Sequence, residues 1–342
     1  MIPAIRAIGN APEWHEGTRA GLSLVRGPAI LEPGAHFNTL SLGNWLTLAA
    51  EAGVPAVPAE HLGSLTPRNM MDIEEAMYDG AEGLDLSAFN AINARLTDLR
   101  GAFMVRCDAV SSGDVKALMG SPVPPGKTRL DLIGPKRGFG YQEHDGRRFL
   151  SVDDSRFSDG VGDWPDGTCP IWARPIVPAR QIDGPNGPFQ AEWRIFVKNG
   201  QISGASSYYP QAPRPVDDAD RTALMAALVH ARKIVDLLVE RSLVPDHPIY
   251  RSYAKIFDPA SIACSIDFIE LDDGQVLLLE GGPASLPKWG SHGCCFADEG
   301  QEEREPVGIA WGGGRFDPPE VLEALLVEVR ARASHDFEDL TP

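Results

Sequence analysis

The stretch CSIDFIELDDGQVLLLEGGP, residues 264–283, decides the fold. It consists of two largely apolar runs separated by Asp272-Asp273-Gly274, and an Asp-Gly step between such runs is a strong signal for a β-hairpin. If Asp273-Gly274 forms a two-residue turn, the register of the strands places Asp267 directly opposite Glu280. The sequence therefore predicts two antiparallel strands that present two carboxylates on one face.

The repulsion between two directly opposed acids has to be offset by another group. Directly opposed residues have Cβ atoms about 4.5–5.5 Å apart, and like charges there destabilise a sheet. Glu280 also ends an apolar run, where an unpaired charge is costly. A divalent cation would remove both problems, and Mg²⁺ is typically held by one or two carboxylates plus nucleotide phosphates. The structural alternative is that one acid faces solvent at a strand end or pairs with an arginine. We predict that Asp267 and Glu280 bind a metal ion.

A second hairpin is predicted in EWRIFVKNGQISG, residues 192–204, around the Asn199-Gly200 turn. Successive side chains of a strand point to opposite faces. The first strand therefore has an apolar face, formed by Trp193, Ile195 and Val197, and an ionic face, formed by Glu192, Arg194, Phe196 and Lys198. The ionic face is either a solvated surface or a cationic wall for a polyphosphate. In the second case Arg194 would make bidentate contacts and Lys198 would act as a point charge.

Further helices and strands are predicted along the chain. Apolar residues three and four apart predict helices over 40–53, about 85–99 and about 319–335, and a long helix that begins at Asp217-Asp218. Strands are predicted at 103–106 and 171–177. Because a helix lies between two hairpins, the order indicates an α+β fold built on antiparallel sheet rather than a doubly wound fold.

These elements resemble the nucleotide-binding half of the ATP-grasp superfamily. The resemblance rests on Arg106 at a strand end, on Ser111-Ser112-Gly113, on the long helix and on the two hairpins. It is closest to the divergent bacterial and phage branch, which has Arg in place of the usual phosphate-binding Lys. It implies an N-terminal α/β domain over residues 1–100, and two subdomains, 101–170 and 171–342, that sandwich a nucleotide.

The resemblance also implies roles for individual residues. Arg106 takes the place of the first phosphate-contacting lysine, and Ser111, Ser112 and Gly113 take the place of the small-residue loop over the phosphates. The segment that contains Trp172 and Arg174 stands where the family binds adenine, although a tryptophan in a short apolar run is also typical of a core. Glu192, Arg194 and Lys198 join the nucleotide site, and Asp267 and Glu280 take the place of the Mg²⁺ ligands.

Two positions depart from the family pattern. An Asn follows the metal-binding Glu by two residues in the family, whereas this chain has Gly282. A cation often precedes the metal-binding Asp by two residues, whereas this chain has Ser265. These departures favour an alternative in which the chain is a nucleotide-binding module without ligase activity, such as a sensor or a partner protein.

The activity implied by the resemblance is ATP- and Mg²⁺-dependent ligation of a carboxylate to an amine, through an acyl phosphate. The expected substrates are small molecules or peptides, and Arg106 and Arg194 are the expected catalytic cations. GSPVPPGKT, residues 120–128, resembles a phosphate-binding loop, but its glycine spacing is one residue too long and its prolines lack backbone N–H groups.

Composition restricts the partners. The 342 residues include 31 Lys and Arg against 48 Asp and Glu, which gives a formal charge of -17. Such a charge repels nucleic acid and anionic membranes, so neither is expected as a partner. No run of apolar residues is long enough for a membrane helix, residues 1–17 lack the apolar core of a signal peptide, and the five cysteines are odd in number. A soluble, cytoplasmic protein is therefore expected.

Overall fold

In the computed structural model, the described residues are 33–34, 36–100, 103–108, 140–151, 168–183, 188–207, 216–246, 262–283, 296, 305–312 and 315–338. They belong to two compact units. Unit 1 comprises the described residues of Pro58–Pro178, and unit 2 comprises those of Gly27–Val57, Ala179–His247 and Ser252–Pro342. The borders of unit 1, after residue 57 and after residue 178, differ from the predicted domain borders after residues 100 and 170. The division into three domains stays a prediction. None of the described helices is long and apolar enough to cross a membrane.

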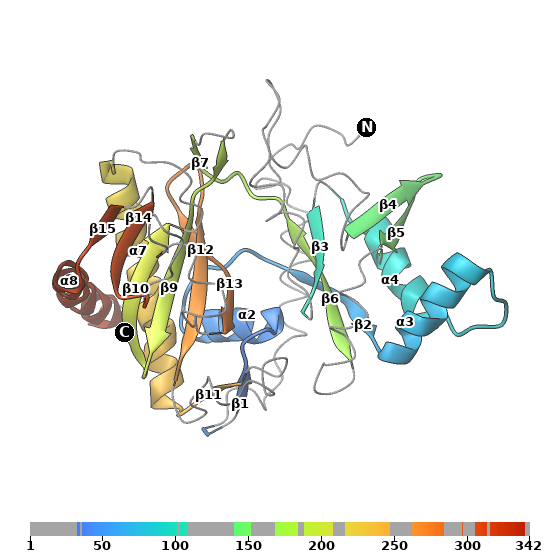
Figure 1. Ribbon diagram of the computed structural model, residues 1–342, viewed down its shortest axis with the longest axis horizontal. Coiled ribbons are helices and arrows are strands. Elements are labelled where there is room, and N and C mark those ends of the chain that lie inside the picture. Colours follow the sequence, from blue (N-terminus) through green and yellow to red (C-terminus); the bar gives the residue numbers. More distant parts are fainter. Residues whose placement is uncertain are drawn as a thin grey trace. The chain divides into compact units, whose positions relative to one another are not determined.

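Unit 2 is built on a six-stranded sheet with the order β13-β12-β9-β10-β14-β15 (Figure 1). All neighbours are antiparallel except β10 and β14, which are parallel. The strands are β9 (Glu192–Lys198), β10 (Gln201–Ser207), β12 (Cys264–Glu270), β13 (Val276–Pro283), β14 (Gly308–Gly312) and β15 (Arg315–Asp317). Short pairs join β1 (His36–Asn38) to β11 (Val244–Asp246), and β7 (Gln181–Ile182) to β8 (Phe189–Gln190).

Three helices of unit 2 cover one face of this sheet and enclose the main core: α2 (Leu42–Glu51), α7 (Asp218–Glu240) and α8 (Pro319–Glu338). The apolar face of β9 packs into this core, as its alternation predicts. The buried stripe of α7 contributes Leu224, Leu228, Ala231, Val235 and Leu238. The opposite face of the sheet therefore presents the ionic side of β9.

Local sequence explains several element ends in unit 2. Asp217 begins α7 with a capping box, because its carboxylate accepts the Asp220 N–H at 2.8 Å and the Asp220 carboxylate accepts the Asp217 N–H. The predicted Asn199-Gly200 turn joins β9 to β10, and both of its residues have positive φ, 52° and 70°. Two positive φ angles are what a type I′ hairpin turn requires.

Unit 1 contains a three-stranded antiparallel sheet with the order β2-β6-β3. Its strands are β2 (Glu60–Leu65), β6 (Cys169–Pro175) and β3 (Phe103–Cys107). The other elements are α3 (Pro67–Glu74), the π-helical turn η1 (Glu75–Asp79), α4 (Ser87–Asp98) and the hairpin of β4 (Gly140–His144) and β5 (Arg147–Ser151). A salt bridge of 2.9 Å between Glu60 and Arg95 joins β2 to α4.

The α+β class with antiparallel sheets is confirmed. The four predicted helices and the strands of both hairpins are present within a few residues of their expected bounds. The N-cap of α4 is Leu86, and the Asp85 carboxylate accepts the Ser87 N–H at 3.0 Å just before the helix. Sequence periodicity missed α3 and the β2, β14 and β15 strands, which are short or interrupted by glycine.

Candidate functional site

The predicted pairing of Asp267 on β12 with Glu280 on β13 is confirmed. The predicted two-residue turn is wrong, because the Leu271 N–H donates to the Gln275 carbonyl at 2.8 Å and leaves three residues in the loop. A bulge, in which Leu279 is the extra residue of β13, shifts the register back by one position. The two departures cancel, so the acids are opposed although the turn differs.

Arg194 of β9 binds Asp267 from the neighbouring strand. Its Nε donates to Oδ1 at 2.7 Å and its Nη2 donates to Oδ2 at 2.6 Å. Both side chains are buried, with exposed fractions of 3% and 5%. Two parallel charge-assisted hydrogen bonds form a strong, geometrically defined pair. The structural alternative, an acid paired with an arginine, therefore exists at Asp267, and metal binding by Asp267 and Glu280 stays a prediction.

The other residues on the ionic face of β9 have different surroundings. Phe196 is buried and packs edge-on against Phe296, with ring centroids 5.4 Å apart. Lys198 is exposed and forms an ion pair with Glu305, while Glu192 is half-buried. The centre of this face is therefore buried. The interpretation of the face as a solvated surface is wrong there. The role of Lys198 and Glu192 in nucleotide binding stays a prediction.

Arg106, Trp172 and Arg174 lie on one face of the unit 1 sheet. Arg106 of β3 pairs directly with Trp172 of β6. Arg174 follows Trp172 by two positions, so both point to the same side. Trp172 and Arg174 are buried, and Arg106 is half-buried. The structure therefore brings together the three residues that the family resemblance assigned to phosphate and adenine.

Trp172 has two features that the sequence did not reveal. Its indole Nε1 is buried, and no acceptor for this N–H is present in the described part of the chain. Its ring lies against His61 of β2, with centroids 4.9 Å apart. Burial, assisted by the charge of Arg95, lowers the pKa of His61, which favours the neutral imidazole. His61 was missed because β2 itself was not predicted.

Ser111, Ser112 and Gly113 lie outside the described residues. The same holds for the loop-like segment 120–128. Their proposed or rejected roles at a phosphate group therefore stay sequence-based predictions.

Arg180 is the centre of a buried ionic cluster that sequence reasoning missed. Its Nη2 donates at 2.7 Å both to Asp220 at the start of α7 and to Glu270 at the end of β12. Burial raises the pKa of Glu270, the Arg180 contacts lower it, and the Asp220 charge raises it further, so the net shift is upward. The three residues are 40 and 90 positions apart in sequence, and no local pattern links them.

Two adjacent glycines of β13 have different surroundings. A Cβ added to Gly281 would lie 2.2 Å from the ring of Trp45 in α2, so this position requires glycine. A Cβ added to Gly282 would meet only the Ser265 hydroxyl, at 3.4 Å. Position 282 therefore has room for a side chain on the face of Asp267 and Glu280.

The described residues contain no group of three or more His, Cys, Asp or Glu side chains that could hold a metal ion by themselves. A cation at Asp267 and Glu280 would therefore need oxygen atoms from a ligand or water. Burial raises the pKa of the Cys264 thiol to about 12, so this cysteine is part of the core rather than a nucleophile.

Among known proteins, only solved structures show similarity to this chain. No family model matches the sequence, and no curated protein matches it. The chain is similar to D-cycloserine synthetase DcsG, with 14% identity, a TM-score of 0.32, and coverage of 77% of this chain and 67% of that one. It is similar to Cdc123 from Schizosaccharomyces pombe, with 13% identity, a TM-score of 0.39, and coverage of 79% and 94%.

A third similar structure is the ATP-grasp ligase PsnB complexed with minimal precursor, Mg and ADP, with 12% identity and a TM-score of 0.26. The alignment covers 84% of this chain and 58% of PsnB. All three TM-scores lie below 0.5, so a function for this chain has to be argued from its own residues.

Proposed function

We propose that this chain is an ATP-dependent carboxylate–amine ligase of the ATP-grasp type. The observation that supports this most is the arrangement of Asp267, Glu280 and Arg194 on three neighbouring strands, on the sheet face opposite α2, α7 and α8. Two carboxylates and a guanidinium on adjacent strands suit the phosphates of a nucleotide and their Mg²⁺.

The donor set at this place fits Mg²⁺. Asp267 and Glu280 offer hard carboxylate oxygens, and Mg²⁺ prefers one or two such groups together with phosphate oxygens. The hydrogen bonds from Arg194 occupy one lone pair on each Asp267 oxygen, and each oxygen retains a second lone pair. Asp267 can therefore bind Arg194 and a cation at the same time, with Glu280 as the second protein ligand.

Unit 1 contributes a second group of residues to the proposal. The pairing of Arg106 with Trp172 places a guanidinium beside an aromatic side chain, and both types of group are common in nucleotide sites. The buried Trp172 N–H supports the presence of a ligand, because an unsatisfied buried donor costs about 1–3 kcal/mol. We assign Arg106 to phosphate, and Trp172 with Arg174 to adenine.

The proposed reaction has two steps. An oxygen of the substrate carboxylate attacks the γ-phosphorus of ATP, which forms an acyl phosphate and releases ADP. The amine nitrogen then attacks the acyl carbon, phosphate leaves, and the nitrogen loses a proton to give the amide. Bound Mg²⁺ would screen the charge of the phosphate oxygens. Arg106 and Arg194 would orient the phosphates and neutralise charge during transfer.

A nucleotide-binding module without ligase activity is the second candidate. Gly282 supports it, because glycine has no oxygen to offer as a third metal ligand beside Glu280. Ser265 supports it as well, since it lacks the positive charge that family members often have there. Both candidates predict Mg²⁺-dependent ATP binding, and they differ in whether ATP is converted to ADP when a carboxylate and an amine are supplied.

The test is a pair of titrations with ATP, with and without Mg²⁺, followed by thermal unfolding. ATP at 100 times its dissociation constant should stabilise the protein by about 2.7 kcal/mol, and only with Mg²⁺. In Glu280→Gln, Mg²⁺ should no longer increase the stabilisation by ATP, because the substitution removes a metal ligand without breaking the pair of Arg194 and Asp267. Glu240→Gln, at the exposed end of α7, is the matched control and should behave as wild type.

Release of ADP is then measured with mixtures of carboxylates and amines. Turnover that needs both substrates supports a ligase, and Mg²⁺-dependent binding without turnover supports the module. The absence of any shift at millimolar ATP and Mg²⁺ would exclude both.

A further inference from the structure

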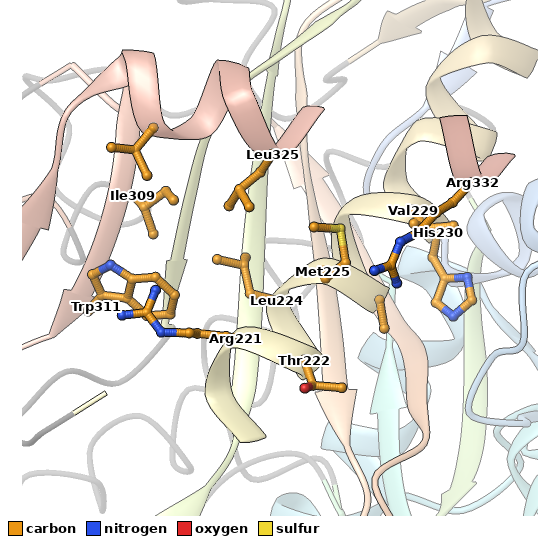
Figure 2. A pocket seen from close by; sticks show the side chains of 12 residues that line it. Arg221, Thr222, Leu224, Met225, Val229, His230, Ile309, Trp311, Leu325 and Arg332 are labelled. Atoms are coloured by element: carbon orange, nitrogen blue, oxygen red, sulfur yellow. The ribbon is translucent and has the colours of Figure 1, made fainter. Parts of the chain in front are cut away.

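A groove on the helical side of unit 2 lies across the sheet from Asp267 and Glu280. It has a volume of about 680 Å³ and runs between α7, α8 and β14. This volume is in the range typical of small-molecule sites, about 300–1,000 Å³. Figure 2 shows Arg221 and Trp311 together at one end, and Val229, His230 and Arg332 at the other.

Apolar side chains form the walls of the groove. Trp311 and Ile309 of β14 are buried at its base, and Met225 of α7 and Leu325 of α8 pack against the core from either side. Val321 keeps 38% of its surface exposed. Apolar surface that is grouped in a concavity rather than scattered is typical of a binding site for an apolar ligand.

The charged groups of the groove are all basic. Its lining contains Arg221, Arg332 and His230, and no Asp or Glu, in a chain with a formal charge of -17. A charged residue within an apolar site usually orients the ligand. The charge of the groove therefore selects an anionic group on an otherwise apolar molecule.

The two arginines are not equivalent. Arg332 donates to Glu328 on its own helix at 2.6 Å. Arg221 lies over the ring of Trp311, with its guanidinium carbon 5.6 Å from the ring centroid. In the described part of the chain Arg221 forms no ion pair with an acid. A guanidinium held against an aromatic face keeps its N–H edge available for a carboxylate. Arg221 is therefore the better anion-binding group.

We propose that this groove binds a small apolar carboxylate, with its carboxylate at Arg221 and its apolar part along Met225 and Val229. From residue 221 to residue 229 the helix rises about 12 Å, at 1.5 Å per residue. A flexible acyl chain can extend over this distance between α7 and α8. The site is separate from the proposed nucleotide site, because the sheet lies between them.

The test is calorimetric titration of the full chain with decanoate and with decanol, which has the same chain without the charge. We expect decanoate to bind more tightly than decanol. Arg221→Gln should weaken decanoate binding by roughly tenfold or more and leave decanol unchanged, because it removes charge-assisted hydrogen bonds only. Arg332→Gln should have a smaller effect, because Glu328 already binds that arginine.

Arg232→Gln is the matched control on the same helix. Arg232 is bound to Asp236, with 3.0 Å between Nε and Oδ2, and does not line the groove. Its decanoate affinity should equal that of wild type. Circular dichroism and thermal unfolding establish that each variant is folded.

Three outcomes would overturn the proposal. They are no decanoate binding at millimolar concentration, equal affinity for decanoate and decanol, and unchanged decanoate affinity in Arg221→Gln. A dimer in sedimentation that Arg221→Gln dissociates would also overturn it, in favour of a second copy of the chain as the occupant. Titration of Arg221→Gln with ATP and Mg²⁺ separates this proposal from the nucleotide proposal, since that binding should be unchanged.

Discussion

Asp267 and Glu270 lie three residues apart on β12 and therefore point to opposite faces of the same sheet. Each is buried and each binds an arginine, but the two ionic groups differ in stoichiometry. Arg194 gives one hydrogen bond to each oxygen of Asp267. Arg180 uses one nitrogen for two acids, Asp220 and Glu270. The Arg194–Asp267 pair is neutral by itself, and the Arg180 group has a net negative charge when both of its acids are ionised.

The excess of acid around Arg180 is reflected in the pKa values of its group. Burial lowers the pKa of Arg180, but the hydrogen bonds to Glu270 and Asp220 raise it by more, so the guanidinium stays charged. The pKa of Glu270 is raised because burial and the neighbouring Asp220 outweigh the single arginine. On one face of β12 an arginine makes a bidentate pair with Asp267, and on the other an arginine links an acid of β12 to an acid of α7.

The largest effect is expected from Arg180→Met, which leaves two buried acids without their cation. Breaking a buried ion pair typically costs about 3–5 kcal/mol, and this variant should lie at the upper end at pH 7. The acids would then have raised pKa values in the folded state, so stability should increase as the pH falls through those values. Urea unfolding at several pH values measures both effects. A loss below about 1 kcal/mol at pH 7 would contradict the ionic role.

Arg194→Met should lower the free energy of unfolding by about 3 kcal/mol, because it leaves one buried carboxylate without its cation, whereas Arg180→Met leaves two. In the double variant Arg194→Met/Asp267→Leu most of this loss should be recovered, since no buried charge remains. Urea midpoints of the wild type, both single variants and the double variant give the coupling energy. Additive effects of the two substitutions would show that the pair contributes little to the fold.

The glycines of β13 extend the comparison of the two faces. Gly281→Ala should destabilise the protein by about 1–3 kcal/mol, because the new Cβ overlaps the buried Trp45 ring on the helical side. Gly282→Ala, on the side of Asp267, should change stability by about 0.5 kcal/mol or less. Thermal unfolding of the two variants, side by side, checks this order. Equal losses would mean that the strand backbone, and not the Trp45 contact, requires glycine.

The smallest effect is expected from Glu270→Gln and lies in the pH dependence. The pKa of Glu270 is raised in the folded state, so its contribution to stability is greatest below its unfolded pKa of about 4.3 and declines as the pH rises through the folded value. Glutamine does not titrate. The stability of wild type relative to Glu270→Gln, measured by urea unfolding at a series of pH values, should therefore decrease as the pH rises from about 4.5 towards 7. A relative gain over this range would reverse the sign of the assigned shift.

The local signals in the sequence were sufficient for several elements of the site. The alternation along β9 predicted which side chains enter the core and which share the face of Arg194. The Asn199-Gly200 turn and the start of α7 at Asp217-Asp218 were also predicted, since each depends on a few consecutive residues. The pairing of Asp267 with Glu280 was predicted through a turn that the protein does not form, and only the bulge at Leu279 restored it.

The sequence by itself determined the α+β class, the two hairpins and the amphipathic helices, because these depend on contacts within a few residues. The tertiary structure decided which cation each acid meets. Arg194 and Asp267 are 73 positions apart, and Arg180 and Glu270 are 90 apart. Such partners depend on which strands become neighbours and on what packs over them, and the groove between α7 and α8 exists only because β14 joins the sheet beside β10.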